Sequence, residues 1–387
     1  MSTETSTLLP PILPPPTAAP TVVDVARAAG VALGTVSRVL NTPEAVRPDI
    51  RQRVLDVIAT MNYRRLRQRR SVPRADTSRR RRRGNLGVLL IGMEESLAQL
   101  PVITEALHGV ELAMAAEEIN LMFANVPLAD RAPAFLTKGQ VDGVIVKSPL
   151  LGDFKACVSA ELVAAIARVP HVWLTGRPDS ATGDVCAAVT DAGARLAAEY
   201  LHAKGHRRIG YLHPRPGPTR SESLKLCFTM HAQRLGIHVQ PFENAPTGPV
   251  RWPLPALSRP SDLMPLLDRW LALPDRGRPT AMLVPADSIA VQLYLAMSQR
   301  GLQVGRDLSV LSFNHEKTLV AGLNPPLTTI DIRAETIGRR AVERLLWCID
   351  HPEDTVPTKV VVEPLLVEGR SVADIGNLEN GQRTSVL

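Results

Sequence analysis

The stretch Thr21–Tyr63, TVVDVARAAGVALGTVSRVLNTPEAVRPDIRQRVLDVIATMNY, decides the fold of the N-terminal part of this chain. Its apolar residues recur three and four positions apart, which predicts short amphipathic helices over Val22–Ala29, Leu33–Asn41 and Pro48–Met61. Gly30 lies between the first two segments, where a tight turn needs a residue that tolerates positive φ. The pattern therefore predicts two helices joined by a glycine turn, with a third helix packed against them.

Two helices joined by such a turn form a helix-turn-helix unit. Small Ala26 lets the two helices approach each other, and Val36 fills the space between them. In these units the second helix places its outward side chains in the major groove of DNA. The outward side chains here are Thr35, Ser37, Arg38 and Asn41. On pattern alone, a small three-helix bundle without DNA binding is the alternative.

The motif DVARAAGVALGTVSRVLN (24–41) resembles the head-piece of the LacI/GalR family of bacterial transcription regulators. Val46, Arg51 and a closing Tyr63 continue the resemblance along the chain. The resemblance is specific, because it combines a long contiguous motif with spaced residues beyond it.

The resemblance implies that Thr21 and Asn41 contact phosphates and that Arg38 contacts a base edge. Leu33 and Gly34 stand where the family varies side chains to choose its operator, and neither side chain can hydrogen-bond. Specificity is therefore expected from Arg38, bidentate to a guanine, and from the following hinge. The residues expected to contact DNA are Thr21, Leu33, Gly34, Thr35, Ser37, Arg38, Asn41, Arg51, Tyr63, Arg70 and Val72.

Residues 64–84, RRLRQRRSVPRADTSRRRRRG, stand where the family has a hinge helix that inserts a Leu into the minor groove. Arg70 fits that pattern, but Arg69 replaces a small residue and Val72 stands at the wedge position. Two alternatives follow: Val72 is a poorer minor-groove wedge, or the segment is a flexible arginine arm on the phosphates. In either case its charge is expected to strengthen DNA binding and make it salt-dependent.

The charge of the chain is concentrated beside these segments. Between Thr21 and Gly84, sixteen arginines accompany five acidic residues, a formal charge of +11, whereas the whole chain carries +7. The remainder is therefore mildly acidic. A basic end on such a body is typical of a nucleic-acid binder with a separate second role.

From residue 85 onward, short apolar runs alternate with amphipathic segments, which predicts doubly wound parallel sheets. Residues 202–212, 301–314 and 325–330 also resemble the LacI/GalR family. The resemblance implies an all-α helix-turn-helix head-piece followed by an α/β periplasmic-binding-protein-like body of two Rossmann-type lobes.

We expect the chain to cross between the two lobes near Thr190, Ile330 and Ile349. The predicted organisation is a disordered Pro-rich tail (1–20), a helix-turn-helix domain (21–63), an Arg-rich hinge (64–84), an effector-binding and dimerisation domain (85–370) and a disordered tail (371–387). Within the body, lobe 1 is expected over about 85–190 and 331–349, and lobe 2 over about 191–330 and 350–370.

Ligands of open α/β sheets bind beyond the carboxyl ends of the strands. Where sugar-responsive members of the family hold hydroxyls, this chain has Leu224, Ala286 and Asn314, although Asp287 is kept. We therefore expect a sugar or sugar derivative held in an atypical way, and the cation of Arg177 favours an acidic or phosphorylated one. The expected effector contacts are Thr175, Arg177, Ser221, Asp287 and Asn314. For each of them, an ordinary loop position is the alternative.

Several function classes fit the sequence poorly. The chain has no nucleotide-binding glycine motif, nucleophile elbow or metal-ligand spacing, so we expect neither an enzyme nor a cofactor. The four cysteines are widely separated, as is typical of reduced thiols. The sequence has neither a membrane-spanning run nor the layout of a signal peptide, which favours a bacterial cytoplasmic, nucleoid-associated protein and disfavours a solute-binding protein.

The sequence and the resemblance together predict a homodimeric repressor that binds a palindromic operator on double-stranded DNA. A small-molecule effector in the cleft between the lobes is expected to control it. A family member that is controlled by a protein partner, or that has no effector, is the alternative.

Overall fold

The computed structural model describes residues 21–41, 43–61, 84–215, 220–245, 248–256 and 259–376. The chain divides into two compact units, Met1–Ser78 and Arg79–Leu387. The predicted hinge or arginine arm lies outside the described residues, apart from Gly84.

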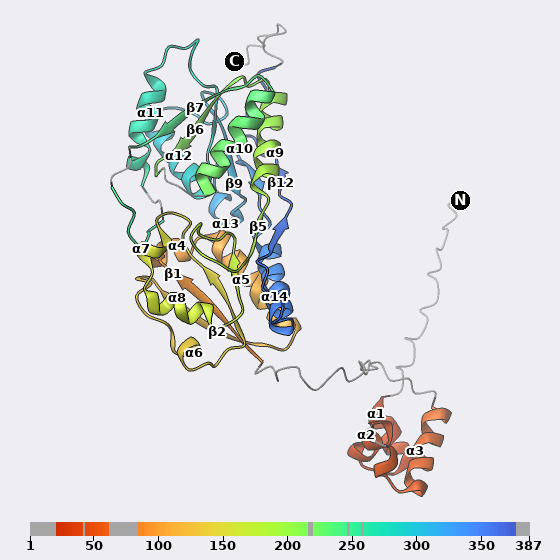
Figure 1. Cartoon of the computed structure of the whole chain (residues 1–387). Helices are drawn as coiled ribbons and strands as arrows, with labels where there is room; N and C mark the ends of the chain where they lie inside the picture. The colour runs from red at the N-terminus through yellow and green to blue at the C-terminus, as the bar shows by residue number, and fades with distance from the viewer. Residues whose placement is uncertain are drawn as a thin grey trace, which may run out of the picture. The chain divides into compact units, whose positions relative to one another are not determined.

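The N-terminal unit contains the three predicted helices (Figure 1). They are α1 (Val22–Ala29), α2 (Leu33–Asn41) and α3 (Pro48–Thr60), with a short 3-10 turn, η1 (Pro43–Ala45), before α3. Thr21 begins α1 through a capping box, since its N–H donates to the Asp24 carboxylate at 2.9 Å while its hydroxyl accepts from the Asp24 N–H at 3.4 Å. Gly30 ends α1 in the left-handed conformation, with φ of 65°.

The core of this unit is small and is shared by all three helices. Its buried residues are Val25, Ala26, Ala29, Val36, Val39 and Val54. Val36 is completely buried, as its predicted place between the helices requires. Because α2 turns Val36 and Val39 inward, its opposite face is left at the surface.

The body has two lobes, each with a six-stranded sheet (Figure 1). The first sheet has the order β11-β5-β4-β3-β1-β2, and all its pairs are parallel. Its strands are β1 (Asn85–Ile91), β2 (Asn120–Val126), β3 (Gly143–Lys147), β4 (His171–Leu174), β5 (Asp184–Ala188) and β11 (Lys359–Val362).

The second sheet has the order β12-β10-β9-β8-β6-β7 and is parallel except for the pair β10–β12. Its strands are β6 (Arg208–His213), β7 (His238–Glu243), β8 (Ala281–Leu283), β9 (Ser309–Asn314), β10 (Thr328–Asp331) and β12 (Leu365–Val367). The predicted fold class, an α-helical head-piece and a two-lobed α/β body, is confirmed.

Helices lie on both faces of each sheet (Figure 1). The helices of the first lobe are α4 (Glu95–Ala98), α5 (Pro101–Ala116), α6 (Ala134–Thr137), α7 (Phe154–Cys157), α8 (Ala160–Ala167) and α14 (Ala334–Asp350). Those of the second are α9 (Thr190–Ala203), α10 (Arg220–Arg234), η2 (Pro260–Asp262), α11 (Met264–Leu271), α12 (Asp287–Gln299) and α13 (Lys317–Val320). One apolar cluster runs through both lobes, from Leu86 in β1 to Phe313 in β9, so the lobes share a core near the crossings.

Two glycines let α5 and α14 lie in direct backbone contact. A Cβ on Gly109 would lie 2.0 Å from the Glu335 carbonyl oxygen, and one on Gly338 would lie 1.9 Å from the Ala106 carbonyl oxygen. Neither position can accept a side chain unless the helices separate. Since α14 directly follows a crossing, this contact fixes the return of the chain to the first lobe.

The third crossing differs from the prediction. We predicted a crossing near Ile349, with residues 350–370 in the second lobe. The segment instead forms two strands, because β11 pairs with β5 in the first sheet whereas β12 pairs with β10 in the second. Pro364 lies between them and cannot donate a ladder hydrogen bond, so the chain leaves one sheet for the other at Glu363–Pro364.

The predicted disorder of residues 371–387 is wrong for residues 371–376. Ser371 is completely buried, its hydroxyl donates to the Val310 carbonyl oxygen at 2.6 Å, and it accepts from the Thr328 N–H at 2.8 Å. These bonds to two strands order the segment, although its composition resembles that of a tail.

The two glycines of the helix-turn-helix should respond oppositely to alanine. Gly30→Ala forces a side chain into the left-handed region and should destabilise α1–α3 by about 1–2 kcal/mol. Gly34→Ala is the matched control: Gly34 lies in α2 with open space around it, and the change should stabilise the unit by up to about 1 kcal/mol. Amide hydrogen exchange of α1–α3 in the full chain measures both effects. Equal protection in the two variants would contradict the assigned turn.

Candidate functional site

The outer face of α2 is available for contact. Leu33 is 49% exposed, and Gly34, Ser37 and Arg38 are also exposed, while Thr35 is partly covered. The buried Val36 and Val39 hold this helix against α1 and α3. The sequence-predicted residues of α2 whose side chains are described therefore share one solvent-facing side of a rigid helix.

Of the other predicted DNA contacts, the structure describes the side chains of Thr21 and Arg51. Thr21 is exposed, and its hydroxyl donates to the Asp24 carboxylate at 2.6 Å. Arg51 is half-buried in α3. Tyr63, Arg70, Val72 and the side chain of Asn41 lie outside the described part of the chain.

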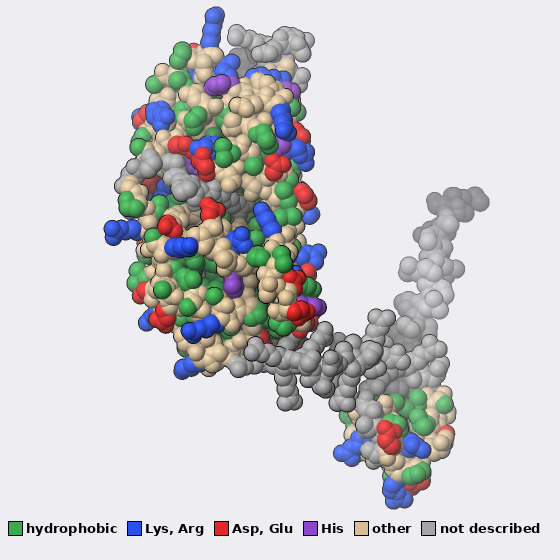
Figure 2. Space-filling model, viewed as in Figure 1, with side chains coloured by type: hydrophobic (Ala, Val, Ile, Leu, Met, Phe, Trp, Pro, Cys, Tyr) green, Lys and Arg blue, Asp and Glu red, His purple; other side chains and the backbone are tan. Residues whose placement is uncertain are grey.

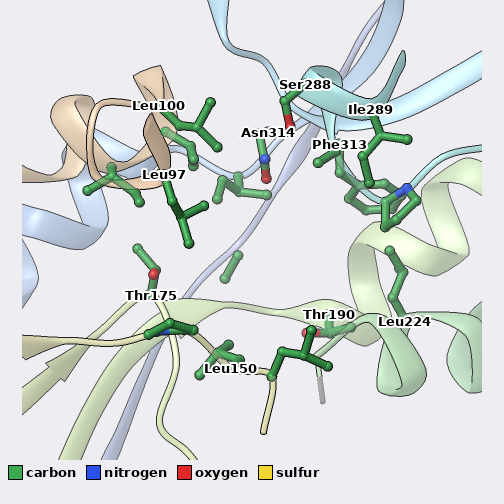
Figure 3. Close-up of a pocket in the computed structure, with 18 of the residues that line it drawn as sticks. Leu97, Leu100, Leu150, Thr175, Thr190, Leu224, Ser288, Ile289, Phe313 and Asn314 are labelled. Atoms are coloured by element: carbon green, nitrogen blue, oxygen red, sulfur yellow. The ribbon is translucent and has the colours of Figure 1, made fainter. Parts of the chain in front are cut away.

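The second candidate site is a cavity of about 290 Å³ between the lobes of the body. Side chains from both lobes point into it (Figure 3). Its polar or charged lining residues are Lys147, Thr175, Thr190, His213, Arg215, Ser288 and Asn314, and no described Asp or Glu lines it. The cavity lies at the carboxyl ends of strands of both sheets, where an α/β fold binds ligands.

The backbone is strained at two of these strand ends. Thr175 directly follows β4 with φ of 61°, and Asn314 ends β9 with φ of 105°, followed by His315 with φ of 57°. Positive φ is rare for residues with a side chain, above all for a β-branched one such as Thr175. Such strain concentrates at binding sites. Two of the predicted effector contacts thus come together on the cavity wall.

Asp287 and Arg177, in contrast, do not line this cavity. The Asp287 carboxylate is completely buried and accepts hydrogen bonds from the Ser312 hydroxyl, from the Thr329 hydroxyl at 2.8 Å and from the Glu316 N–H at 2.7 Å. These bonds occupy it within the second lobe. The direct ligand contact that we predicted for Asp287 therefore does not match its position.

Arg177 lies in a neighbouring, more polar pocket of about 660 Å³. Its guanidinium donates to the Gly183 carbonyl oxygen. Thr175 and Thr190 line both this pocket and the cavity, so the two spaces adjoin. The side chain of Ser221 lies outside the described residues.

A strap across the cleft, residues 248–256, was missed in the sequence, where it is only a Pro-rich connection. It leaves the second lobe after β7 and hydrogen-bonds to the first lobe. The Leu254 N–H donates to the Gly92 carbonyl oxygen at 2.9 Å, and the Trp252 indole donates to the Leu151 carbonyl oxygen at 2.8 Å. The signal in the sequence was the alternation of the apolar residues Val250, Trp252, Leu254 and Ala256 within a Pro-rich stretch.

Two cations and one neutral imidazole border the cavity. Lys147 is buried, and its ammonium donates to the Ser148 carbonyl oxygen at 2.9 Å. Arg215 is half-buried, and its guanidinium donates to Pro255 of the strap at 3.0 Å. Burial, together with the charges of Lys225 and Arg215, lowers the pKa of His213 to about 4, so its ring is neutral near pH 7.

The described residues contain no cluster of His, Cys, Asp and Glu side chains that could hold a metal ion. Within the same residues, no helix is long and apolar enough to cross a bilayer. On the face drawn in Figure 2, acidic and basic side chains of the body are interspersed, so that face shows no extended basic surface.

The comparisons with known proteins agree with this arrangement. Residues 21–65 match the profile of bacterial regulatory proteins of the lacI family, and residues 198–372 match that of the periplasmic binding protein-like domain. The HTH-type transcriptional repressor PurR of Mannheimia succiniciproducens is 29% identical over 362 residues, covering 92% of this chain and 99% of the relative. The ribose operon repressor of Haemophilus influenzae is 27% identical over 373 residues, covering 91% and 98%.

Solved structures share the fold. A lac repressor dimer bound to operator and an anti-inducer has a TM-score of 0.57 at 23% identity, covering 92% of this chain and 100% of that one. A complex of the regulator CelR with cellobiose has a TM-score of 0.57 at 22% identity, covering 91% and 99%. On its two matched domains and these relatives, the chain belongs to the lacI family of bacterial regulatory proteins, which are DNA-binding regulators and not enzymes.

Proposed function

We propose that this protein is a cytoplasmic repressor that binds a palindromic operator as a homodimer, with α2 of each subunit in the major groove. The observation that carries the proposal is the exposed face of α2, held by a buried core behind a glycine turn. The repressor names of the relatives support it. One recognition helix reads only a few base pairs, so two helices related by a dyad are needed for a specific site.

The first sheet offers a surface for a second copy of the chain. Its edge strand β2 exposes two large apolar side chains, Leu121 (45% exposed) and Phe123 (54% exposed). Alternate residues of the same strand, Met122 and Ala124, pack inward. An exposed apolar edge strand is a pairing or aggregation surface unless another chain covers it. A homodimer contact there explains why these side chains are apolar.

We infer that a small molecule in the inter-lobe cavity changes the affinity for DNA. The walls come from both lobes, so a bound molecule favours one lobe arrangement over another, which is what allosteric control requires. Control by a protein partner is less well supported, because a formed cavity with strained backbone at its wall suits a small ligand.

Glu316 joins the lobes beside this cavity. Its carboxylate is completely buried and accepts from the N–H of Val102, in α5 of the first lobe, at 3.2 Å. It also accepts from the N–H of Ser288, in α12 of the second lobe, at 3.3 Å. Burial raises the pKa of Glu316 to about 7, and the nearby Asp287 carboxylate adds to the shift.

Selection of random DNA fragments by the full-length protein tests the operator proposal. It should yield an inverted repeat, and Arg38→Ala should cost roughly 1–3 kcal/mol of binding and relax one base position per half-site. Arg53→Ala is the matched control, since it removes another exposed arginine, from α3. Recovery of single, unrepeated sites would argue against the dimer, and equal loss on every sequence would mean that Arg38 serves only phosphates.

Phe123→Arg should weaken self-association of the full chain by at least about tenfold, because it places a charge in a contact that buries apolar surface. Sedimentation over a range of concentrations measures the change. Val356→Arg, at a 69% exposed loop position, should leave the association unchanged. A wild-type protein that stays monomeric would contradict the homodimer itself.

The titration of Glu316 should make the body less stable as pH rises. Its folded pKa, about 7, lies above the ordinary value of 4.5, so the folded state holds the extra proton at lower pH. The stabilisation that this proton gives to the folded state is complete below about pH 4.5 and is lost as pH rises through 7. Between pH 6.5 and 8.5 the free energy of unfolding should therefore fall by about 1 kcal/mol.

Tryptophan fluorescence of the full chain follows unfolding of the body, because all four tryptophans lie there. Glu316→Gln should remove the pH dependence in this window, whereas Glu335→Gln, an exposed carboxylate in α14, should not. The buried His206 and His213 have pKa values near 4 and stay neutral throughout the window. An identical pH slope in wild type and Glu316→Gln would rule out the assigned group.

A further inference from the structure

We propose that the cavity between the lobes binds a compact apolar carboxylate, such as an alicyclic or aromatic acid, and not a sugar. The inference rests on the effector control proposed above and specifies the class of ligand.

The cavity walls are apolar on both sides. Leu97 of α4, Leu100 just before α5, and Leu150 face it from the first lobe, while Leu224 of α10 and Ile289 of α12 face it from the second (Figure 3). A sugar carries hydroxyl groups around its whole ring, and each hydroxyl placed against one of these aliphatic side chains loses water without gaining a partner there. A hydrocarbon ring gains from the same contacts.

Two backbone N–H groups at the cavity wall are already engaged within the protein. The N–H of Ser288 donates to Glu316 at 3.3 Å, and the N–H of Thr175 donates to the Cys186 carbonyl oxygen at 2.8 Å. Leu224 and Ala286 both form parts of the wall and add no polar atoms from their side chains. The cavity therefore suits a ligand with one polar end.

The charged side chains at the wall determine which charge the polar end of the ligand should carry. Lys147 comes from the first lobe and Arg215 from the second, and no described carboxylate lines the cavity. Asp262 and Glu94 act on Arg215 from outside the lining. The Nδ1 atom of His213 accepts from the Arg215 N–H at 3.0 Å, so the proton of the neutral ring is on Nε2, which makes that atom a donor.

Cations and a neutral donor around an apolar space favour an anionic acceptor. A carboxylate that interacts with one cation from each lobe also favours the arrangement in which the lobes lie close together. The cavity volume of about 290 Å³ is at the small end for ligand sites, which suits a single substituted ring.

Calorimetry on the full-length protein tests the ligand class. The probes are cyclohexanecarboxylate and 3-phenylpropionate, their primary amides, and ribose, glucose and ribose 5-phosphate. At least one acid should bind about tenfold or more tightly than its amide and than every sugar, because only the acid matches both the walls and the charges.

Two variants locate the binding. Leu97→Asp places a carboxylate at a half-buried wall position and should weaken binding of the acid by about tenfold or more. Leu295→Asp, at a position on α12 that is 48% exposed, should leave the affinity for the acid unchanged. Arg215→Gln should bring the acid-to-amide affinity ratio toward one while the amide binds as before. Arg234→Gln, exposed at the end of α10, is its control.

The outcomes separate this inference from the proposed function. Tighter binding of a sugar than of any acid would overturn the ligand class but leave effector control in the cleft intact. Acid binding that is unaffected by Leu97→Asp would mean that the site is elsewhere. Acid binding that does not alter operator affinity would support the ligand class and contradict effector control. If no probe binds, both are overturned.

Discussion

The hydrogen bonds of the Glu316 carboxylate connect the two halves of the body. One oxygen accepts from the start of α5 in the first lobe and the other from the start of α12 in the second. Helix N-termini favour a negative charge, whereas burial opposes it, and these effects act on the same carboxylate. The strength with which Glu316 holds the lobes together therefore depends on the balance between these two effects. Any movement of the lobes at this point has to break or replace these bonds.

The hydrogen bonds around Glu316 also explain why Asp287 is buried away from the cavity. Asp287 is retained where the family has an acid, yet hydrogen bonds from Ser312, Thr329 and the Glu316 N–H occupy it. Two buried carboxylates lie side by side and are served by protein donors, so neither lines the cavity. The cavity wall is formed mainly by apolar side chains, with Lys147 and Arg215 as its charged residues. The hydrogen bonds that keep Asp287 and Glu316 inside the protein thus also leave the cavity wall without a carboxylate.

Much of the fold was predictable because its signals are local. Gly30 and the spaced valines predicted three helices, and the alternating apolar runs predicted the strands of both sheets. The errors came from non-local pairing. Nothing in residues 359–366 alone says that β11 pairs with β5 while β12 pairs with β10, and Pro364 is the one local sign of the break. Residues 371–376 were likewise ordered by bonds to distant strands, which composition does not record.

The sequence predicted where the candidate ligand site lies but not what forms its walls. Strand ends identified Thr175 and Asn314, but the walls depend on a strap whose partners, Gly92 and Leu151, are far away in the sequence. This strap and Glu316 both join the lobes beside the cavity. A ligand buried against both lobes loses part of that burial when they separate, so its binding energy adds to these contacts. Under the effector control proposed above, a ligand that makes few hydrogen bonds can therefore still favour one lobe arrangement, because its apolar contact with both walls depends on how close the lobes lie.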